Sequence, residues 1–134
     1  MARTRRFQQL VVWANAMDFA DEVYDVTERW PATEVYRVVD QVRRAAISIP
    51  ANIAEGQGRR GSKEFAHHLS IAYGSLTEAE TLLMIACRRK FIGESEAERL
   101  LAQSDEVSRL LQGTIQSLQR AIANPTTKQR PEQN

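Results

Sequence analysis

The residues whose types and spacing first suggest chemistry are the two histidines, because one of them closes a Glu-x-x-His pattern. Glu64 and His67 match one element of a di-iron bundle site. Such a site needs two of these elements and a glutamate from each of two further helices. The chain has one such element, and His67 and His68 are its only histidines. Neighbouring helical residues point about 100° apart, so these two cannot chelate one ion. We predict solvated histidines, no metal and no cofactor.

Other reactive side chains also lack the partners that catalysis needs. Cys87 is the only cysteine, and nothing in the sequence places a base beside it. Glu78 and Glu80 face different sides of a helix, so they do not form an acid–base couple. Glu80 is instead a candidate for an ion pair between helices. The glycines around Gln57 lack the strand and the Gly-Lys-Ser element of a phosphate loop. The sequence therefore predicts that the protein is not an enzyme.

Length and composition limit the classes of protein further. The 134 residues suffice for one domain with a single core. The chain is 43% hydrophobic and 26% charged, as is usual for a globular protein, and its 6 glycines and 4 prolines disfavour a turn-rich β fold. A single cysteine cannot form an intrachain disulfide and fits a reducing compartment. No apolar run reaches the ~20 residues of a membrane span. We expect a cytoplasmic protein without a membrane partner.

Four segments carry apolar residues at the three- and four-residue spacing of helices with one buried face. They are separated by short breaks and cover about 7–29, 34–56, 62–90 and 95–123. Thr33, Ser62 and a Ser95–Glu98 capping box are the expected helix starts. Long helices joined by short loops pack antiparallel. We predict an all-α, up-down-up-down antiparallel four-helix bundle at 7–124, after a basic arm at 1–6 and before a disordered tail at 125–134.

The second predicted helix contains Pro50, which cannot donate to the carbonyl of Ala46. We therefore predict a kink or break near this residue. Asn52 could donate a hydrogen bond to a carbonyl that Pro50 leaves without a partner. Glu55 could pair with an arginine of this chain or of a neighbour. With Glu80, these residues are candidates for a polar lock that fixes one packing arrangement. A ligand-binding role is the alternative.

The first and third predicted helices carry more apolar residues than one buried stripe needs. The additional residues lie off the main stripe of each helix and are candidates for an oligomer interface: Val12, Phe19, Val26, Ile71, Leu82 and Ile85. A wide core face would explain them as well. We favour the subunit interface, because contiguous apolar patches on soluble proteins mark interaction sites.

Basic residues gather in clusters although the formal net charge is only +1. The arm and the tail are basic, which leaves the body at −3. The candidate nucleic-acid contacts are Arg43, Arg44, Arg59, Arg60, Lys63, Arg88, Arg89 and Lys90. The third helix separates its two clusters by about 35–40 Å, and a cyclic assembly would repeat each one as a ring of positive charge. A solvated surface, with the second cluster at the negative end of a helix dipole, is the alternative.

The segment 43–59 also carries a specific resemblance, in the sequence RRAAISIPANIAEGQGR. It resembles the signature of a bacterial four-helix-bundle family whose founding members are encoded by intervening sequences in large-subunit ribosomal RNA genes. Further matches are 62–65 (SKEF), 71–76 (IAYGSL), Glu78, Glu80 and the opening 7–13. The resemblance implies a homopentamer with no known catalytic activity.

A related branch of this family is the accessory protein of diversity-generating retroelements. The resemblance to that branch implies binding of reverse transcriptase and nucleic acid through a strongly basic surface. The chain departs from that branch, because its body is net acidic. The leading hypothesis is a non-enzymatic homo-oligomeric scaffold or adaptor for a protein or ribonucleoprotein. Direct RNA or DNA binding through the arginine clusters is the second hypothesis, and an enzyme is the third.

Overall fold

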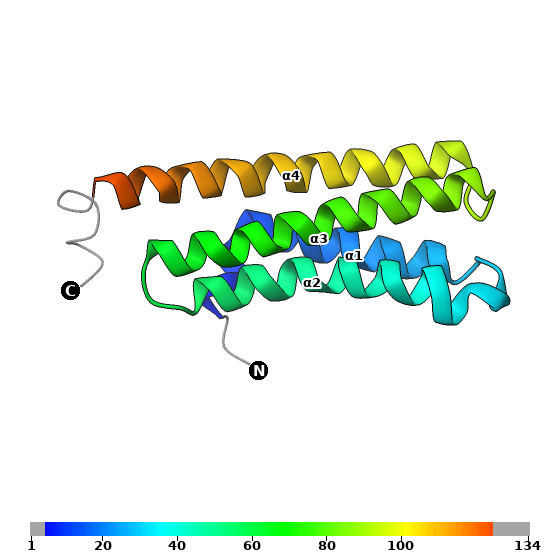
Figure 1. The fold of residues 1–134 in the computed structure, drawn as a ribbon, viewed down its shortest axis with the longest axis horizontal. Coiled ribbons are helices and arrows are strands. Elements are labelled where there is room, and N and C mark those ends of the chain that lie inside the picture. The colour runs from blue at the N-terminus through cyan, green and yellow to red at the C-terminus, as the bar shows by residue number, and fades with distance from the viewer. Residues whose placement is uncertain (1–4, 125–134) are drawn as a thin grey trace.

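Four long helices form the body of the protein in the computed structural model, which describes residues 5–124 (Figure 1). They are α1 (Val11–Thr27), α2 (Asp40–Gln57), α3 (Ser62–Arg88) and α4 (Glu94–Ala123). Short 3-10 segments at Arg6–Gln9 and Ala32–Glu34 and a π-helical segment at Val35–Val39 complete the order. No strand occurs within the described range. The all-α, antiparallel four-helix bundle is confirmed; the tail predicted to be disordered lies outside the described residues.

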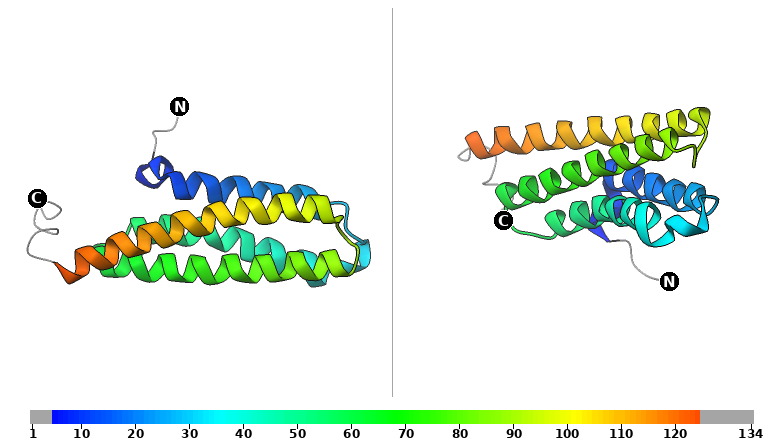
Figure 2. Two further views of the ribbon diagram at one scale, coloured as in Figure 1. Left: turned by 90° about the horizontal axis from the view of Figure 1, so that it is seen from above. Right: turned by 45° about the vertical axis from the view of Figure 1, so that its right-hand side comes forward.

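Each helix packs against two neighbours, α1 on α2 and α4, and α3 on α2 and α4 (Figures 1 and 2). The helices form because apolar residues recur at helical spacing, and their packing removes this face from water. Phe19, Leu69 and Leu100 are among the largest fully buried side chains. The core is therefore continuous through the four helices.

The second apolar stripe of α1 belongs to this core. Val12, Phe19 and Val26 are buried in the single chain, and so is Leu82 of α3. These four residues are already buried within one chain, so their prediction as oligomer-interface residues is wrong. The physical reason is that α1 touches both α2 and α4, and two neighbours at different angles bury a wider arc than one stripe. Ile71 and Ile85 remain exposed, each at 41%.

The irregular part of the second helical region lies near its start rather than at Pro50. Helix α2 continues through Pro50, which is buried inside it. The predicted break therefore does not occur, and the predicted kink at Pro50 is not shown. Non-helical backbone angles lie instead at Arg37, with φ −122° and ψ −106°, within the π-helical segment. Regular α-helix begins only at Asp40, so Thr33 does not cap it.

Backbone geometry, rather than side-chain caps, begins α3 and α4. Gly61, with φ +89°, precedes α3, and Gly93 precedes α4; neither start has a side-chain cap hydrogen bond. The predicted capping box at Ser95 is therefore wrong, because α4 already begins at Glu94. Helix α3 ends in a Schellman motif, in which the Phe91 N–H donates to the Ala86 carbonyl at 2.9 Å. Lys90 takes the left-handed position of this motif, with φ +64°.

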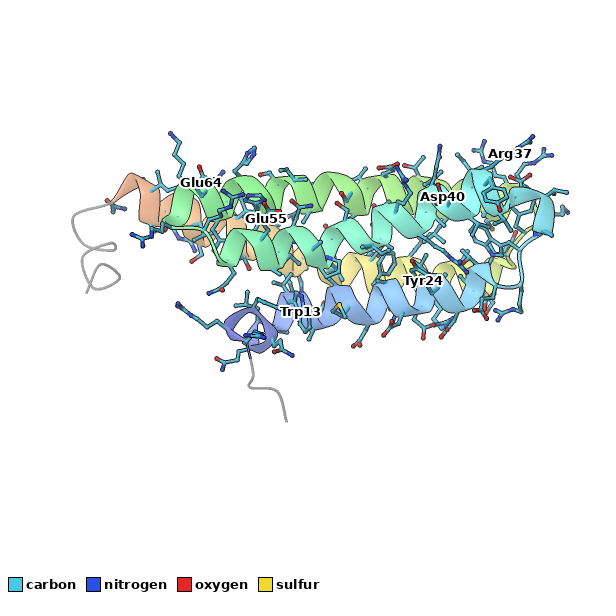
Figure 3. The ribbon with its side chains drawn as sticks, turned by 90° about the horizontal axis from the view of Figure 1, so that it is seen from below. Trp13, Tyr24, Arg37, Asp40, Glu55 and Glu64 are labelled. Carbon is cyan, nitrogen blue, oxygen red and sulfur yellow. The ribbon has the colours of Figure 1, made fainter. Side chains whose placement is uncertain are left out.

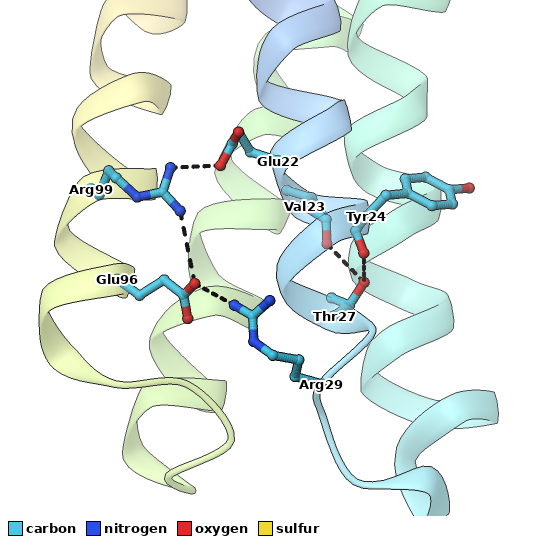
Figure 4. A network of polar contacts seen from close by, with 7 residues as sticks. All are labelled: Glu22, Val23, Tyr24, Thr27, Arg29, Glu96 and Arg99. Carbon is cyan, nitrogen blue, oxygen red and sulfur yellow. Dashed lines mark hydrogen bonds and ion pairs between the residues drawn. The ribbon is translucent and has the colours of Figure 1, made fainter.

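Ion pairs set the register of α1 against α4 near one end of the bundle (Figure 4). Arg99 on α4 contacts Glu22 on α1 at 2.6 Å, and Glu96 contacts Arg29 at 2.5 Å. The arginines are exposed and the glutamates are half-buried at the surface, so each pair contributes at most about 1 kcal/mol to stability. The two pairs show which turns of α1 and α4 face each other.

Candidate functional site

A chain of polar side chains runs between α2 and α3, beginning near the middle of the bundle. Ser75 Oγ donates to Ser48 Oγ across the two helices at 2.8 Å. Asn52 Nδ2 donates to the same Ser48 hydroxyl at 3.0 Å and to the Ser48 carbonyl at 2.9 Å. Its amide oxygen lies 3.2 Å from His68 Nδ1 on α3. We refer to Ser48, Asn52, Glu55, His68 and Ser75 as the polar chain.

The polar chain continues to the surface through Glu55. His68 is buried, and its Nε2 lies 3.9 Å from a Glu55 carboxylate oxygen. Because an amide oxygen only accepts hydrogen bonds, the bond to Asn52 requires a proton on His68 Nδ1. Arg59 Nη2 donates to Glu55 at 2.7 Å, and this bond lowers the pKa of the Glu55 carboxyl below its usual value. The carboxylate next to His68 is therefore ionised at neutral pH.

Gly56 lets the helices approach closely at this point. A Cβ at position 56 would lie 2.7 Å from His68 Cβ, 3.0 Å from Phe65 Cδ1 and 3.3 Å from the Phe65 carbonyl oxygen. Real Cβ atoms essentially never come within 3.0 Å of another heavy atom. A side chain at residue 56 is therefore incompatible with the His68–Asn52 contact, and glycine is required by packing rather than by backbone conformation.

A second polar contact joins α3 to α4. Glu80 accepts a hydrogen bond from the buried Ser104 hydroxyl at 2.7 Å. The ion pair predicted for Glu80 is therefore a charge-assisted hydrogen bond to a neutral partner. Tyr73 and Gln112 make a further contact between the same helices, where the amide donates to the phenol oxygen at 2.9 Å.

The polar lock predicted at Asn52 and Glu55 exists in part, with different partners. Asn52 bonds the carbonyl of Ser48, not that of Ala46. Glu55 has the predicted arginine partner in Arg59, but its side chain is 51% exposed and is not a buried charge. Ser48, Ser75 and the burial of His68 were missed. The spacing of Ser48 and Asn52, one turn apart beside small residues, was the available signal.

A shallow hollow leads to the inner end of the polar chain. It has a volume of about 340 Å³ and is lined by Gln41, Arg44, Ala45, Ser48, Ser75 and Glu78. Its charged members are exposed and of opposite sign. The Ser48 hydroxyl accepts hydrogen bonds from the Ser75 hydroxyl and from the Asn52 amide. These contacts join α2 to α3.

The basic candidates divide into those used for packing and those exposed to solvent. Arg43 is half-buried: its Nε donates to Thr27 Oγ1 at 2.8 Å and its Cζ lies 4.5 Å above the Tyr24 ring. Arg44 lies 3.9 Å from Asp40, and Arg59 pairs with Glu55. The remaining candidates are exposed, and none has an ion-pair partner among the described residues: Arg60, Lys63, Arg88, Arg89 and Lys90.

The exposed cations lie at the two ends of α3. Its 27 residues span about 40 Å. The structure therefore keeps the predicted separation of the two clusters. Within residues 5–124, no three His, Cys, Asp or Glu side chains are close enough to hold a metal ion. In the same range, no helix combines the length and apolarity that crossing a membrane requires.

Comparisons with known proteins agree with the signature segment. Residues 8–113 match the model of the 23S rRNA-intervening sequence protein family. A comparison with curated protein sequences finds no match. Among solved structures, a protein of unknown function from the S23 ribosomal protein family of Bacteroides thetaiotaomicron VPI-5482 is similar, with 25% sequence identity and a TM-score of 0.71. The alignment covers 78% of this chain and 98% of that one. Because the matched region includes α1, α2, α3 and most of α4, the chain belongs to the 23S rRNA-intervening sequence protein family.

Proposed function

We propose that this protein is a non-enzymatic scaffold or adaptor that assembles from identical copies, as a pentamer, in the cytoplasm. The observation that carries the proposal is a set of exposed apolar side chains on α3, on either side of Glu78, which we name the α3 row. Ile71 and Ile85 lie fourteen residues apart on one side of the helix, and both are 41% exposed. Met84, next to Ile85, is 52% exposed. Apolar surface of this kind marks interaction sites on soluble proteins.

A second apolar surface supports a ring rather than a simple dimer. Met17 and Tyr24 on α1 and Ile47 on α2 are exposed large apolar side chains on different helices from the α3 row. A closed ring of identical subunits needs two different complementary faces, whereas a two-fold dimer uses one face twice. The polar chain contributes by fixing α2 against α3, so that the two surfaces keep a constant relation.

Replacing Ile71 and Ile85 together by aspartate is expected to dissociate the assembly, because two charges would be buried without partners at the subunit contact. Multi-angle light scattering should give five times the 15.2 kDa chain mass for the parent protein and a single chain for the variant. The matched control is Ser70→Asp, an exposed position on the next face of the same helix, which should leave the assembly intact. A parent protein that stays a single chain at high concentration would contradict the proposal.

Nucleic-acid binding is the second candidate function, favoured by the five exposed cations without ion-pair partners. For phosphate contacts, the logarithm of the binding constant falls linearly with the logarithm of salt concentration. On a single strand each phosphate contact contributes about 0.7 to this slope, so removing two contacts should flatten it by about 1.4.

The expected result for Arg60→Gln with Lys63→Gln is such a flatter slope and weaker binding of a 20-nucleotide single-stranded RNA, measured by fluorescence anisotropy between 50 and 200 mM salt. Arg109→Gln is the control, because Arg109 is paired with Glu106 at 2.6 Å. A slope near zero for the parent protein would rule out this second function.

A further inference from the structure

About two fifths of α4 extends past the start of α1. Helix α1 has 17 residues and α4 has 30, or about 25 Å against about 45 Å. The ion pairs from α4 to Glu22 and Arg29 align the C-terminal end of α1 with the N-terminal end of α4. The difference in length therefore falls at the C-terminal end of α4. Figures 1 and 2 show this end of α4 well beyond the start of α1.

Residues of α4 are fully buried only along the part of the helix that lies beside α1. Leu100, Val107 and Leu111 are completely or almost completely buried. Beyond Leu111, no residue of α4 within the described range is buried, although the apolar spacing continues. The half-buried residues that continue it are Ile115, Leu118, Ala121 and Ile122, which we name the open face.

Within residues 5–124, the chain covers the open face only in part, because its four residues are half-buried. The 3-10 segment Arg6–Gln9 packs against α1 and α2, not along α4. Residues 125–134 contain no aliphatic or aromatic side chain, and residues 1–4 offer only Met1 and Ala2. The missing contact is about three helical turns long, so an amphipathic helix of 10–14 residues would fit it.

The charge around the open face defines the polar side of such a helix. Helix α4 has no acidic residue after Glu106, and α1 has none before Asp18. Exposed cations at this end are Arg5, Arg6, Arg60, Lys63 and Arg120. The acidic residues of the same end are Glu55, which Arg59 already pairs, and Glu64 (Figure 3). The exposed charge at this end of the bundle is therefore mostly positive.

We propose that the open face binds an amphipathic helix of a partner protein whose polar side is acidic. Its apolar side would complete the four-helix packing that α1 leaves unfinished, and its carboxylates would complement the mostly positive charge at this end of the bundle. This inference rests on the proposed adaptor function, because it specifies the kind of protein that the adaptor takes up. A second copy of this chain fits less well. Its acidic helix is α1, and the apolar side of α1 is already buried in the core of that copy.

The test uses the full-length protein and synthetic 14-residue helical peptides with leucines on one side and glutamates on the other. Binding is measured by isothermal titration calorimetry at 150 mM salt. The glutamate peptide is expected to bind at least tenfold more tightly than the same peptide with lysines in place of glutamates. A scrambled glutamate peptide without an apolar side should not bind.

Two variants connect the binding to the open face. Leu118→Ser with Ile122→Ser is expected to weaken binding of the glutamate peptide at least tenfold, whereas Gln116→Ser, at an exposed position about 160° around the helix from Leu118, should leave it unchanged. Circular dichroism checks that each variant keeps its helices. If the Leu118 and Ile122 variant unfolds, Arg60→Gln with Lys63→Gln, which removes only charge at this end of the bundle, should still weaken binding of the glutamate peptide several-fold.

Several outcomes would overturn the inference. They are equal binding of the glutamate and lysine peptides, no binding of either, and binding that is unaffected by Leu118→Ser with Ile122→Ser. Loss of the oligomer in the variant at Leu118 and Ile122 would assign the open face to a second copy. Displacement of the peptide by RNA, with unchanged dependence on Leu118, would assign the cations of this end to nucleic acid. The light-scattering mass distinguishes the two proposals: an intact oligomer without peptide binding contradicts this inference alone.

Discussion

Replacing Gly56 by valine is expected to lower the free energy of unfolding by about 2–3 kcal/mol. Even the first carbon of the new side chain would lie 2.7 Å from His68 Cβ and 3.3 Å from the Phe65 carbonyl oxygen. The carbonyl belongs to the backbone of α3, so it cannot turn aside as a flexible side chain would. The end of α2 must move away from α3, which breaks the contact between Asn52 and His68. Urea denaturation followed by circular dichroism at a fixed protein concentration measures the loss.

The matched control for this substitution is Gly113→Val in α4. A Cβ there meets no heavy atom within 4 Å. Valine is a better helix former than glycine, so the variant should be as stable as the parent or slightly more stable. If both glycine variants lost the same stability, backbone conformation rather than contact between α2 and α3 would explain the effect, and the packing argument would fail.

Replacing Phe19 by alanine is expected to lower the free energy of unfolding by about 3–5 kcal/mol, because it removes a large ring from the core and leaves a cavity. Phe19 is completely buried within one chain. The loss should therefore appear in the stability of the fold, and it should not depend on whether copies associate. Denaturation at several protein concentrations separates the two effects, since subunit contacts make apparent stability depend on concentration.

Ile85→Ala provides the contrast. This side chain is exposed, so its removal should change the unfolding free energy of the single chain by well under 1 kcal/mol. The proposed subunit contact predicts instead a weaker assembly at low protein concentration. If Phe19→Ala changed the oligomer mass and left the unfolding free energy unchanged, the placement of Phe19 in the core would be disproved.

Predicting this site from sequence succeeded for residues whose role is local and failed for contacts between helices. Asn52 and Glu55 were recognised because a proline and small residues surround them on one helix. Arg59 was identifiable as a partner because it lies one turn from Glu55. The partners on α3 were not identifiable, because nothing in the sequence states which turn of α3 lies beside Asn52. His68 was therefore assigned to solvent, although it is buried against Asn52.

The apolar stripes show the same division. Helical periodicity identified every long helix and most of the core, because burying one face of a helix requires that spacing. It did not decide whether Phe19 or Ile71 faces the interior. Both lie off the main stripe of their helices, yet Phe19 lies in the arc between α2 and α4 while Ile71 points outward. This choice depends on the angles at which the neighbouring helices approach.

By itself, the sequence determined the fold class, the approximate extents of the four helices and the position of the signature segment, because these depend on spacing along one chain. The tertiary structure alone decided the partners of the polar chain, the burial of Val12, Phe19, Val26 and Leu82, and the continuity of α2 through Pro50. It also decided that α1 stops short of the end of α4. These properties depend on which turns of different helices face each other, and side-chain contacts between helices set that register rather than any spacing within one helix.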